Sequence, residues 1–346
     1  MTLEDFNYYL PPELIAQEPI SPRDHSNLLI LNRSTGKIAH HKFYEIIDYL
    51  TPQDVLVFND TQVVPARLLG NKEKTGAKTE ILLIKPQGQN SFDYSVWPAA
   101  WIALGKNLNE GDKVVFSGTL EGRVQAKHNY EIVIEFNQKD DNLKESILSL
   151  GKIPLPPYIK KPTNASFSNY QTVYAKKVGA VAAPTAGFHF TQELLDKIKH
   201  KGVQIEFLTL HIGLGTFLPV KETTIEEHKM HSEYFILELE VAKRINQAKD
   251  LNKRIIAVGT TVVRVLESCA QNGVLFPREG ETSLFIFPPY NFQIVDALIT
   301  NFHLPKSTLL MLVSAFAGLD LIKSAYLEAV EKRYRFFSFG DAMMIV

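Results

Sequence analysis

A chain of 346 residues is longer than one hydrophobic core usually serves, so we expect two domains. With 45% hydrophobic and 22% charged residues, the composition is that of a globular protein and excludes a disordered or fibrous one. The net charge of −1 provides no overall field for a polyanion, so any binding of nucleic acid requires a local basic patch.

The sequence gives no sign of export. The N-terminus lacks the basic start and apolar run of a signal peptide, and the most apolar segment, Leu309–Ala317, is too short to span a bilayer. The single cysteine, Cys269, excludes an internal disulfide and fits a reducing compartment. We therefore expect a cytoplasmic protein that has no membrane partner.

In chain order, the first clear element is a short buried strand, Asp54–Phe58. Beyond it, turn signals separate six short segments that have no helical period. The expected strands are Val63–Leu69, Thr79–Lys85, Phe92–Trp97, Lys113–Phe116, Gly122–Ala126 and Tyr130–Phe136. Six strands at this spacing favour a small antiparallel barrel, because closure removes the exposed edges of a sheet.

Further along, strands alternate with helices. Three more strands are expected. The pattern alternates in Val203–Leu208 and is that of a buried strand in Arg254–Val258, and a third strand, Val295–Ile299, precedes Asn301. The expected helices are Thr191–His200, Thr261–Cys269, Ser307–Gly318 and Ser324–Lys332. In the first of these helices, Thr191 can cap the start and Gly202 stops the end.

These elements predict an α/β fold, in which a large mixed α/β domain carries an inserted small antiparallel β-barrel domain. We assign residues 1–61 and 151–346 to the large α/β domain, and residues 62–150 to the barrel. The segment Pro154-Leu-Pro-Pro marks the return of the chain to the large domain.

Several familiar motifs are absent. The sequence has no Walker loop, no Gly-x-Ser-x-Gly elbow and no Cys-x-x-Cys pair. Gly213-Leu-Gly215 lacks the third glycine and the helical continuation of a dinucleotide fingerprint. His228 and His231 can share a helix face, but their charged surroundings and the lack of further ligands argue against a metal.

Polar residues instead gather where strands end. Asn59-Asp60-Thr61 follows a buried strand, where open α/β sheets place ligand-binding groups, although a simple turn fits equally well. Pro184-Thr-Ala-Gly-Phe-His189 combines small residues with a histidine just before a helix N-terminus, which favours anions and a neutral imidazole. The alternative for His189 is a core histidine that bonds a carbonyl.

Three further junctions have the same character: His211 with the loop Gly213–Gly215, then Gly259-Thr260-Thr261, and Asn301-Phe-His303. Each can also be read as ordinary helix capping. Near the C-terminus, Lys332–Asp341 interleaves basic and aromatic residues, which suits the stacking of a base and the pairing of phosphates. We expect its phenylalanines to pack in the core, whereas Arg333 and Arg335 are less easily buried.

Twelve segments, in order and nearly end to end, resemble the S-adenosylmethionine:tRNA ribosyltransferase-isomerase family of queuosine biosynthesis. They are Leu10–Gln17, Pro22–Ser26, Asp54–Thr61, Pro65–Leu68, Ile153–Ile159, Tyr170–Ala175, Ala182–Gly187, Leu210–Phe217, Met230–Glu233, Val258–Arg264, Leu298–Ser307 and Tyr334–Met343. The resemblance implies transfer and isomerisation of the ribosyl group of S-adenosylmethionine onto 7-aminomethyl-7-deazaguanine in a tRNA anticodon. The products would be epoxyqueuosine-tRNA, adenine and methionine.

The resemblance also implies the cofactors, partners and catalytic groups. S-adenosylmethionine is then a co-substrate, with no permanently bound cofactor and no required metal, and we expect a monomer that acts on tRNA. Such chemistry needs a base beside the sulfonium and a proton for the departing adenine. Our hypotheses are His189 as the base, His211 and His303 for proton transfer, and Asp60 and Glu233 for ribose hydroxyls or the attacking amine.

The binding groups follow from the same resemblance. Candidate contacts to S-adenosylmethionine are Thr185, Gly187, Gly213 and Gly215. Gly259, Thr260 and Thr261 are candidates for binding its carboxylate. Candidate contacts to tRNA phosphates are Arg264, Arg333 and Arg335. Two other functions stay open: a non-enzymatic RNA-binding module that reads RNA with its barrel, and an acid–base hydrolase that uses His189 and Asp60. Only the transferase would release adenine together with methionine.

Overall fold

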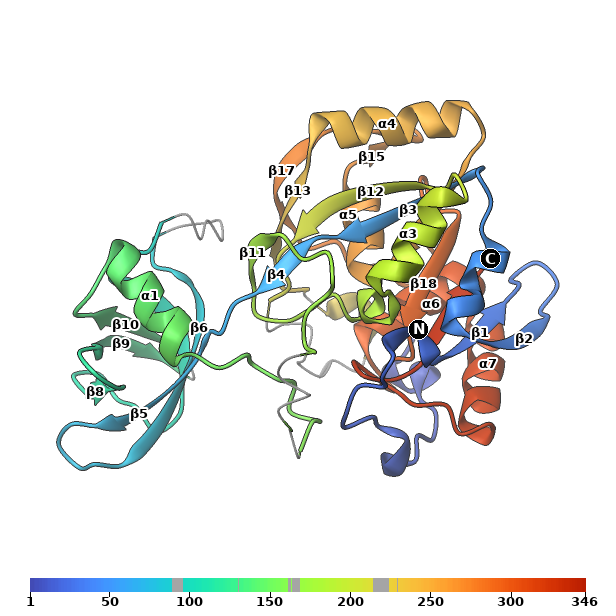
Figure 1. Ribbon diagram of the computed structural model, residues 1–346. Helices are drawn as coiled ribbons and strands as arrows, with labels where there is room; N and C mark the ends of the chain where they lie inside the picture. Colours follow the sequence, from blue (N-terminus) through green and yellow to red (C-terminus); the bar gives the residue numbers. More distant parts are fainter. Residues whose placement is uncertain (89–95, 130, 161–162, 164–168, 214–223, 229) are drawn as a thin grey trace.

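The computed structural model describes residues 1–346 except 89–95, 130, 161–162, 164–168, 214–223 and 229. Two bodies are visible in Figure 1: a small β-barrel with one helix, and a large sheet with helices on both sides. This arrangement confirms the expected fold class. The boundaries that we assigned to the two domains stay a prediction.

The large sheet has nine strands in the order β17-β13-β12-β3-β14-β18-β19-β1-β2. Their bounds are β1 Asn27–Leu31, β2 Ile38–Lys42, β3 Asp54–Asn59, β12 Gln204–Leu210, β13 Glu233–Leu237, β14 Arg254–Val258, β17 Arg278–Thr282, β18 Ala297–Asn301 and β19 Ala342–Ile345. The central strands β12, β3, β14 and β18 pair in parallel, and the next strand on either side, β13 and β19, pairs antiparallel with them.

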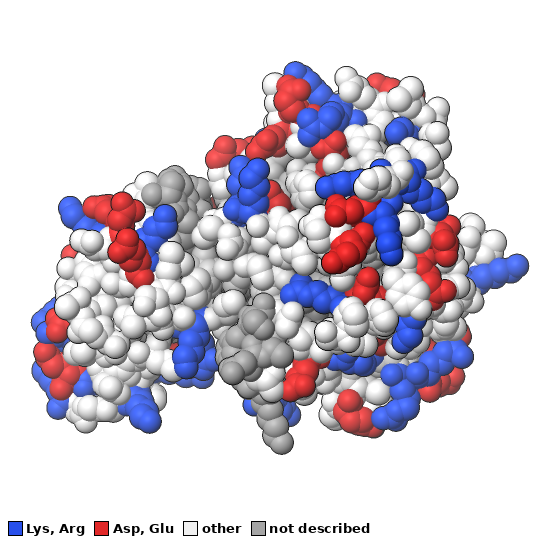
Figure 2. Space-filling model, viewed as in Figure 1, with Lys and Arg blue, Asp and Glu red and all other residues white. Residues whose placement is uncertain are grey.

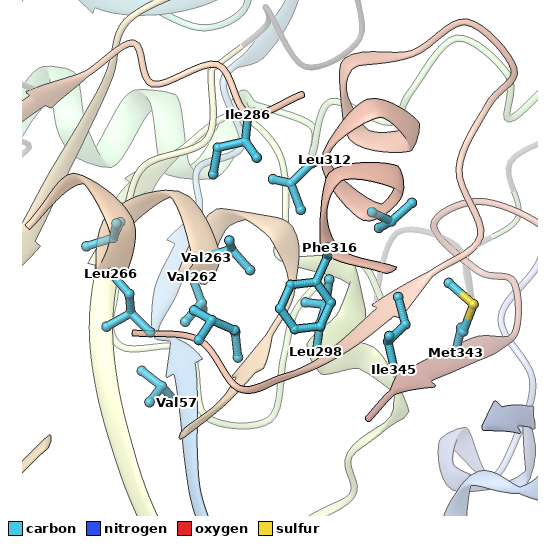
Figure 3. Packing of buried hydrophobic residues seen from close by; sticks show 14 of the residues in the cluster. Val57, Val262, Val263, Leu266, Ile286, Leu298, Leu312, Phe316, Met343 and Ile345 are labelled. Atoms are coloured by element: carbon cyan, nitrogen blue, oxygen red, sulfur yellow. The ribbon is translucent and has the colours of Figure 1, made fainter. Parts of the chain in front are cut away.

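Helices cover both faces of this sheet. They are α3 Gln192–His200, α4 Leu239–Asp250, α5 Thr260–Ser268, α6 Thr308–Ala317 and α7 Leu319–Glu331. Alternate residues of β3 face opposite sides, so that Val57 packs with α5 and α6 whereas Phe58 packs with α3. Figure 3 shows Val262 and Val263 of α5 close to the sheet, with Phe316 of α6 beside Leu298.

The helix signals of the sequence are largely confirmed. Thr191 caps α3 by accepting a hydrogen bond from the N–H of Leu194, and Ser307 caps α6 in the same way. Gly318 follows α6 at φ +95°, a conformation that favours glycine. The helix expected from Ser324 is wrong at its start, since α7 begins directly after Gly318.

The barrel is closed by six antiparallel strands in the order β10-β7-β6-β5-β8-β9. Their bounds are β5 Arg67–Lys72, β6 Lys78–Pro86, β7 Ala100–Gly105, β8 Lys113–Val115, β9 Glu121–His128 and β10 Glu131–Phe136. The barrel has a hydrophobic core of its own, to which α1, Asp140–Leu150, contributes Leu143 and Ile147.

Two strand expectations in this region need comment. Residues 92–95 of the expected strand Phe92–Trp97 lie outside the described part and Trp97 is not in a strand, whereas β7, which the sequence did not predict, is a strand of the barrel. The segment expected as one strand from Val63 to Leu69 is divided. Its start belongs to β4, Thr61–Val63, which pairs with β11, Lys177–Ala180, and its end belongs to β5.

The remaining elements are short. A small hairpin joins β15 Ala270–Gln271 to β16 Val274–Leu275, and 3-10 helices lie at Leu3–Phe6, Pro12–Leu14, Arg23–His25, Phe43–Tyr49, Thr185–His189 and Ile225–Glu227. Within the described ranges, no single helix is both long and apolar enough to cross a membrane. Helices α6 and α7 reach the required length and composition only as a pair that is bent by 115°.

Candidate active site

The polar junctions of the sequence meet at one edge of the large sheet. Because β12, β3, β14 and β18 are parallel neighbours, their carboxyl ends lie side by side. The residues at or just after these ends are His211, Asn59, Gly259 and Asn301. Ligands of open α/β sheets bind at such an edge.

A pocket of about 610 Å³ opens beside this edge. Its volume lies in the range of small-molecule sites. Tyr158, Phe302 and Phe337 contribute aromatic surface. The polar groups of its wall include Thr185, Gly259, Thr260, Thr261, Asn301 and His303. The structure thus brings five of the predicted site residues into one cavity, together with Asn301.

The start of α5 forms one wall of the pocket. Gly259 caps it at φ +96°, and the N–H groups of the next two residues have no acceptor inside the helix. The side-chain amide of Asn59 contacts the hydroxyl of Thr261 at 3.4 Å, which ties this helix start to the end of β3. Free N–H groups and the helix dipole suit an anion such as a carboxylate.

Asn301 connects the pocket to His189. Its side-chain carbonyl accepts a hydrogen bond from the Thr185 hydroxyl (3.2 Å), and its amide donates to Nε2 of His189 (3.2 Å) and to the main-chain oxygen of Phe337 (3.0 Å). Nε2 of His189 therefore accepts, and the ring proton lies on Nδ1, 2.7 Å from the hydroxyl of Ser26.

His189 is held as a neutral ring. Its imidazole stacks on Phe43, with the ring centres 4.9 Å apart. Burial, and then the charges of Arg335 and Arg23, lower the pKa of His189 to about 3. The sequence expectation of a neutral histidine thus agrees with this environment, but His189 lies behind Asn301 and is not part of the pocket wall.

His303 does line the pocket. Its Nε2 lies 2.9 Å from the hydroxyl of Thr300, and its main chain is fixed by the hydroxyls of Tyr326 and Tyr8. Burial lowers the pKa of His303 to about 3, so that the ring is neutral at physiological pH. A neutral imidazole on a pocket wall can accept a proton from a bound substrate.

His211 and Asp60 form a second polar cluster, around the ends of β12 and β3. Nδ1 of His211 lies 2.7 Å from the hydroxyl of Thr61, and Thr209 donates a hydrogen bond of 2.7 Å to Asp60. Burial lowers the pKa of His211 to about 4, helped by the charge of Lys177, and burial raises the pKa of Asp60. Neither residue is part of the 610 Å³ pocket.

Glu233 and Arg264 form a buried ion pair. Both side chains are at most 5% exposed, and Glu233 also accepts a hydrogen bond of 2.9 Å from the N–H of Gly213. Arg264 further donates to the main-chain oxygens of Leu284 and Thr282. This placement does not fit a phosphate contact by Arg264, because its guanidinium is already enclosed and paired.

The remaining predicted site residues are Gly187, Gly215, Arg333 and Arg335. A side chain at Gly187 would put its Cβ 1.9 Å from the hydroxyl of Tyr174, so packing alone requires glycine there. Gly215 lies outside the described residues. Arg333 is exposed and Arg335 is half-buried, and Phe336, Phe337 and Phe339 are buried as expected.

Sequence reasoning missed part of this site. Asn301 was named only as part of a junction, and Tyr158, Tyr170 and Ser338 of the pocket wall were not singled out. The position of Asn301 at the end of a buried strand was the available signal, whereas Tyr158 carries none. Over the described ranges, no group of three or more His, Cys, Asp or Glu side chains has the geometry of a metal site.

Comparison with known proteins agrees with the sequence resemblance. A family described as queuosine biosynthesis protein matches residues 3–345. The chain is 52% identical to the S-adenosylmethionine:tRNA ribosyltransferase-isomerase of Carboxydothermus hydrogenoformans and 49% identical to that of Staphylococcus epidermidis, over the full length of all chains. A crystal structure of S-adenosylmethionine tRNA ribosyltransferase from Thermotoga maritima matches 99% of this chain and 100% of its own, with a TM-score of 0.57 and 39% identity.

The fold, the pocket and these similarities define an α/β transferase of queuosine biosynthesis. More particularly, the chain belongs to the family of S-adenosylmethionine:tRNA ribosyltransferase-isomerases.

Proposed function

We propose that this protein transfers and isomerises the ribosyl group of S-adenosylmethionine onto 7-aminomethyl-7-deazaguanine in a tRNA anticodon. Epoxyqueuosine-tRNA, adenine and methionine would be the products. The observation that carries the proposal is a pocket whose wall combines the free start of α5, a neutral histidine and aromatic side chains. The protein would act as a cytoplasmic monomer, without a permanently bound cofactor or a metal.

The start of α5 would hold the carboxylate of S-adenosylmethionine. The N–H groups of Thr260 and Thr261 supply donors there, and Gly259 lets the ligand approach the main chain. Thr185, on the same pocket wall, would contact the ribose hydroxyls, since its own hydroxyl is oriented by Asn301.

His303 fits the role of the base better than His189. The sulfonium acidifies the neighbouring C–H, and His303 is the neutral imidazole on the pocket wall that can take up its proton. His189 would act as a positioning residue through Asn301, because both its ring nitrogens are engaged. This assignment changes our first hypothesis, in which His189 was the base.

The second cluster would serve the attacking amine. Asp60 and His211 lie at the neighbouring strand ends, and a neutral His211 can accept the proton that the amine loses on attack. Glu233 would orient the main chain at Gly213 and not contact the substrate, since Arg264 encloses its carboxylate.

The decisive experiment is to incubate the protein with S-adenosylmethionine and tRNA that carries the aminomethyl base. We expect adenine and methionine to appear in equal amounts, and only with the modified tRNA. Matched controls are tRNA with ordinary guanine at that position and the His303→Gln variant, in which we expect a loss of about 100-fold or more in kcat. RNA binding without release of either product would favour the binding module. Cleavage without S-adenosylmethionine would favour a hydrolase.

A further inference from the structure

A shallow depression adjoins the pocket on the side of His189. It is lined by Arg23, Asn169, His189, Ser338 and Gly340, among others. Ser338 belongs to both cavities, and its hydroxyl is hydrogen-bonded to that of Tyr158 in the pocket. A ligand that fills the pocket and passes Ser338 would therefore reach the depression.

Arg23 presents a positive charge to this depression. Its guanidinium donates to the main-chain oxygen of Gln171 (2.6 Å) and to the main-chain and side-chain oxygens of Asn169 (3.2 and 3.0 Å). All these partners are neutral, and no carboxylate of the described chain lies within 4 Å of the guanidinium. The group is half-buried, so its charge is only partly screened by water.

Arg335 brings a second positive charge close to His189. It is half-buried and donates to the main-chain oxygen of Glu18. The carboxylates of Asp341 and Glu18 are its acidic neighbours, but among the described residues neither forms an ion pair with its guanidinium, and that of Asp341 is taken up by the N–H groups of Asn27 and Arg335 and by the amide of Asn27. Glu18 directly precedes Pro19, which lines the depression, so this hydrogen bond holds the guanidinium of Arg335 at its edge.

We propose that this depression binds a backbone phosphate of the RNA next to the nucleotide whose base enters the pocket. The inference rests on the proposed function. An enzyme that acts on a base must take it out of the stack, and the flipped nucleotide then leaves its phosphate at the mouth of the pocket. Two guanidinium groups that form no ion pair with any carboxylate in the described part of the chain suit a phosphate, since arginine pairs with phosphate oxygens through several N–H groups.

Binding of an RNA hairpin that carries the aminomethyl base tests this site. One hairpin is unmodified in its backbone, and two others carry a neutral methylphosphonate at the phosphate on either side of the target nucleotide. The proteins are wild type, Arg23→Gln, Arg335→Gln and Arg33→Gln. Arg33 is a matched control because it is also half-buried and donates to main-chain oxygens, those of Phe316 and Asp296. It covers the ring of Phe316 as Arg23 covers that of Phe188, but it does not line the depression.

We expect Arg23→Gln and Arg335→Gln each to weaken binding about tenfold and to make the dependence of log Kd on log salt shallower by about 0.7 to 0.9. One of the two methylphosphonates should weaken binding of the wild type by a similar factor, and should cause no further loss in these variants. Arg33→Gln should leave binding, and its sensitivity to the methylphosphonate, as in the wild type. Thermal unfolding of each variant confirms that it is folded.

Three results would overturn the proposal. In the first, the loss of affinity for a methylphosphonate hairpin in an arginine variant equals the product of the two separate losses, which would show that the arginine and the phosphate do not contact each other. An equal loss in Arg33→Gln would point to general destabilisation. A higher KM for S-adenosylmethionine in Arg23→Gln and Arg335→Gln, with unchanged RNA binding, would show that these arginines bind the carboxylate of S-adenosylmethionine and not a phosphate. Absence of adenine and methionine release by the wild type would instead contradict the proposed function, because the binding measurements need no turnover.

Discussion

The side-chain amide of Asn301 donates a hydrogen bond to Nε2 of His189, and this contact links the end of β18 to the 3-10 turn before α3. It also fixes the tautomer of the histidine, whose proton then points to Ser26. The two side chains form one unit with Thr185 on the pocket wall. Their contributions to catalysis should therefore depend on each other.

We expect His189→Ala and Asn301→Ala each to lower kcat by about 10- to 100-fold. The kcat of the double variant should be no lower than that of the less active single variant. The reason is that either substitution already breaks the hydrogen-bonded unit, so the second one removes nothing more. Rates of adenine release at saturating substrates measure this. The shape of the pH–rate profile should stay that of the wild type in His189→Ala. Loss of its acidic limb would instead identify His189 as the base.

Three buried histidines should make stability depend on pH. Burial lowers the pKa values of His189 and His303 to about 3 and of His211 to about 4, below the value of 6.5 in an unfolded chain. Between these limits the unfolded state binds more protons, so stability is full above pH 6.5 and falls as the pH is lowered towards 3 to 4.

The slope should be about 1.3 kcal/mol per pH unit for each histidine, or about 4 kcal/mol for the three together, between pH 6 and 5. Urea unfolding at these two pH values measures it. His303→Gln should reduce the slope by about one third. Replacement of the exposed His128 by glutamine should leave it unchanged, and an equal slope in both variants would contradict the assignment.

Much of the fold was predictable because local signals agreed with the final packing. Thr191 and Ser307 cap their helices where the sequence placed them, and the turn-separated strands close a barrel. Strand β7 was missed because Ile102 and Leu104, on its outer side, are as apolar as the inward Trp101. No alternation therefore marked it. Helix α4 was not predicted either, although it carried a signal: its buried residues Val241, Ala242, Ile245 and Ala248 follow a helical spacing.

The site was predictable only in outline. Strand ends identified the edge of the sheet, because parallel strands place their carboxyl ends together. The sequence did not show that Asn301 stands between His189 and the pocket, or that Arg264 pairs with Glu233, which lies 31 residues earlier. Such contacts depend on how separate strands and helices pack, and no local pattern contains that information.

Gly179 should be required for the position of His211. A Cβ at this residue would lie 2.5 Å from Nε2 and Cε1 of the His211 ring, which is closer than such atoms approach. We expect Gly179→Ala to displace the ring from Thr61, to destabilise the fold by about 1 to 3 kcal/mol, and to lower kcat. Gly118→Ala, where φ is +60° and nothing lies near the Cβ position, adds backbone strain away from the site, and tests whether a loss of stability by itself leaves kcat unchanged. Equal activity of Gly179→Ala and wild type would contradict the role of His211.

The buried pair of Arg264 and Glu233 gives a test that separates a structural arginine from one that binds RNA. Removal of one partner leaves the other charge buried and uncompensated, which costs about 3 to 5 kcal/mol. Arg264→Met should therefore lower the free energy of unfolding by this amount. Glu233→Gln should cost less, because the amide still accepts a hydrogen bond from Gly213.

The double variant Arg264→Met/Glu233→Leu should recover part of the stability lost in Arg264→Met, since no unpaired charge remains buried. In every variant that remains folded, the dependence of RNA binding on salt should equal that of the wild type, because a guanidinium that is at most 5% exposed releases no counterion from RNA. A shallower dependence in Arg264→Met, with little loss of stability, would restore Arg264 as a phosphate contact. Urea unfolding and RNA binding on the same preparations decide between the two roles.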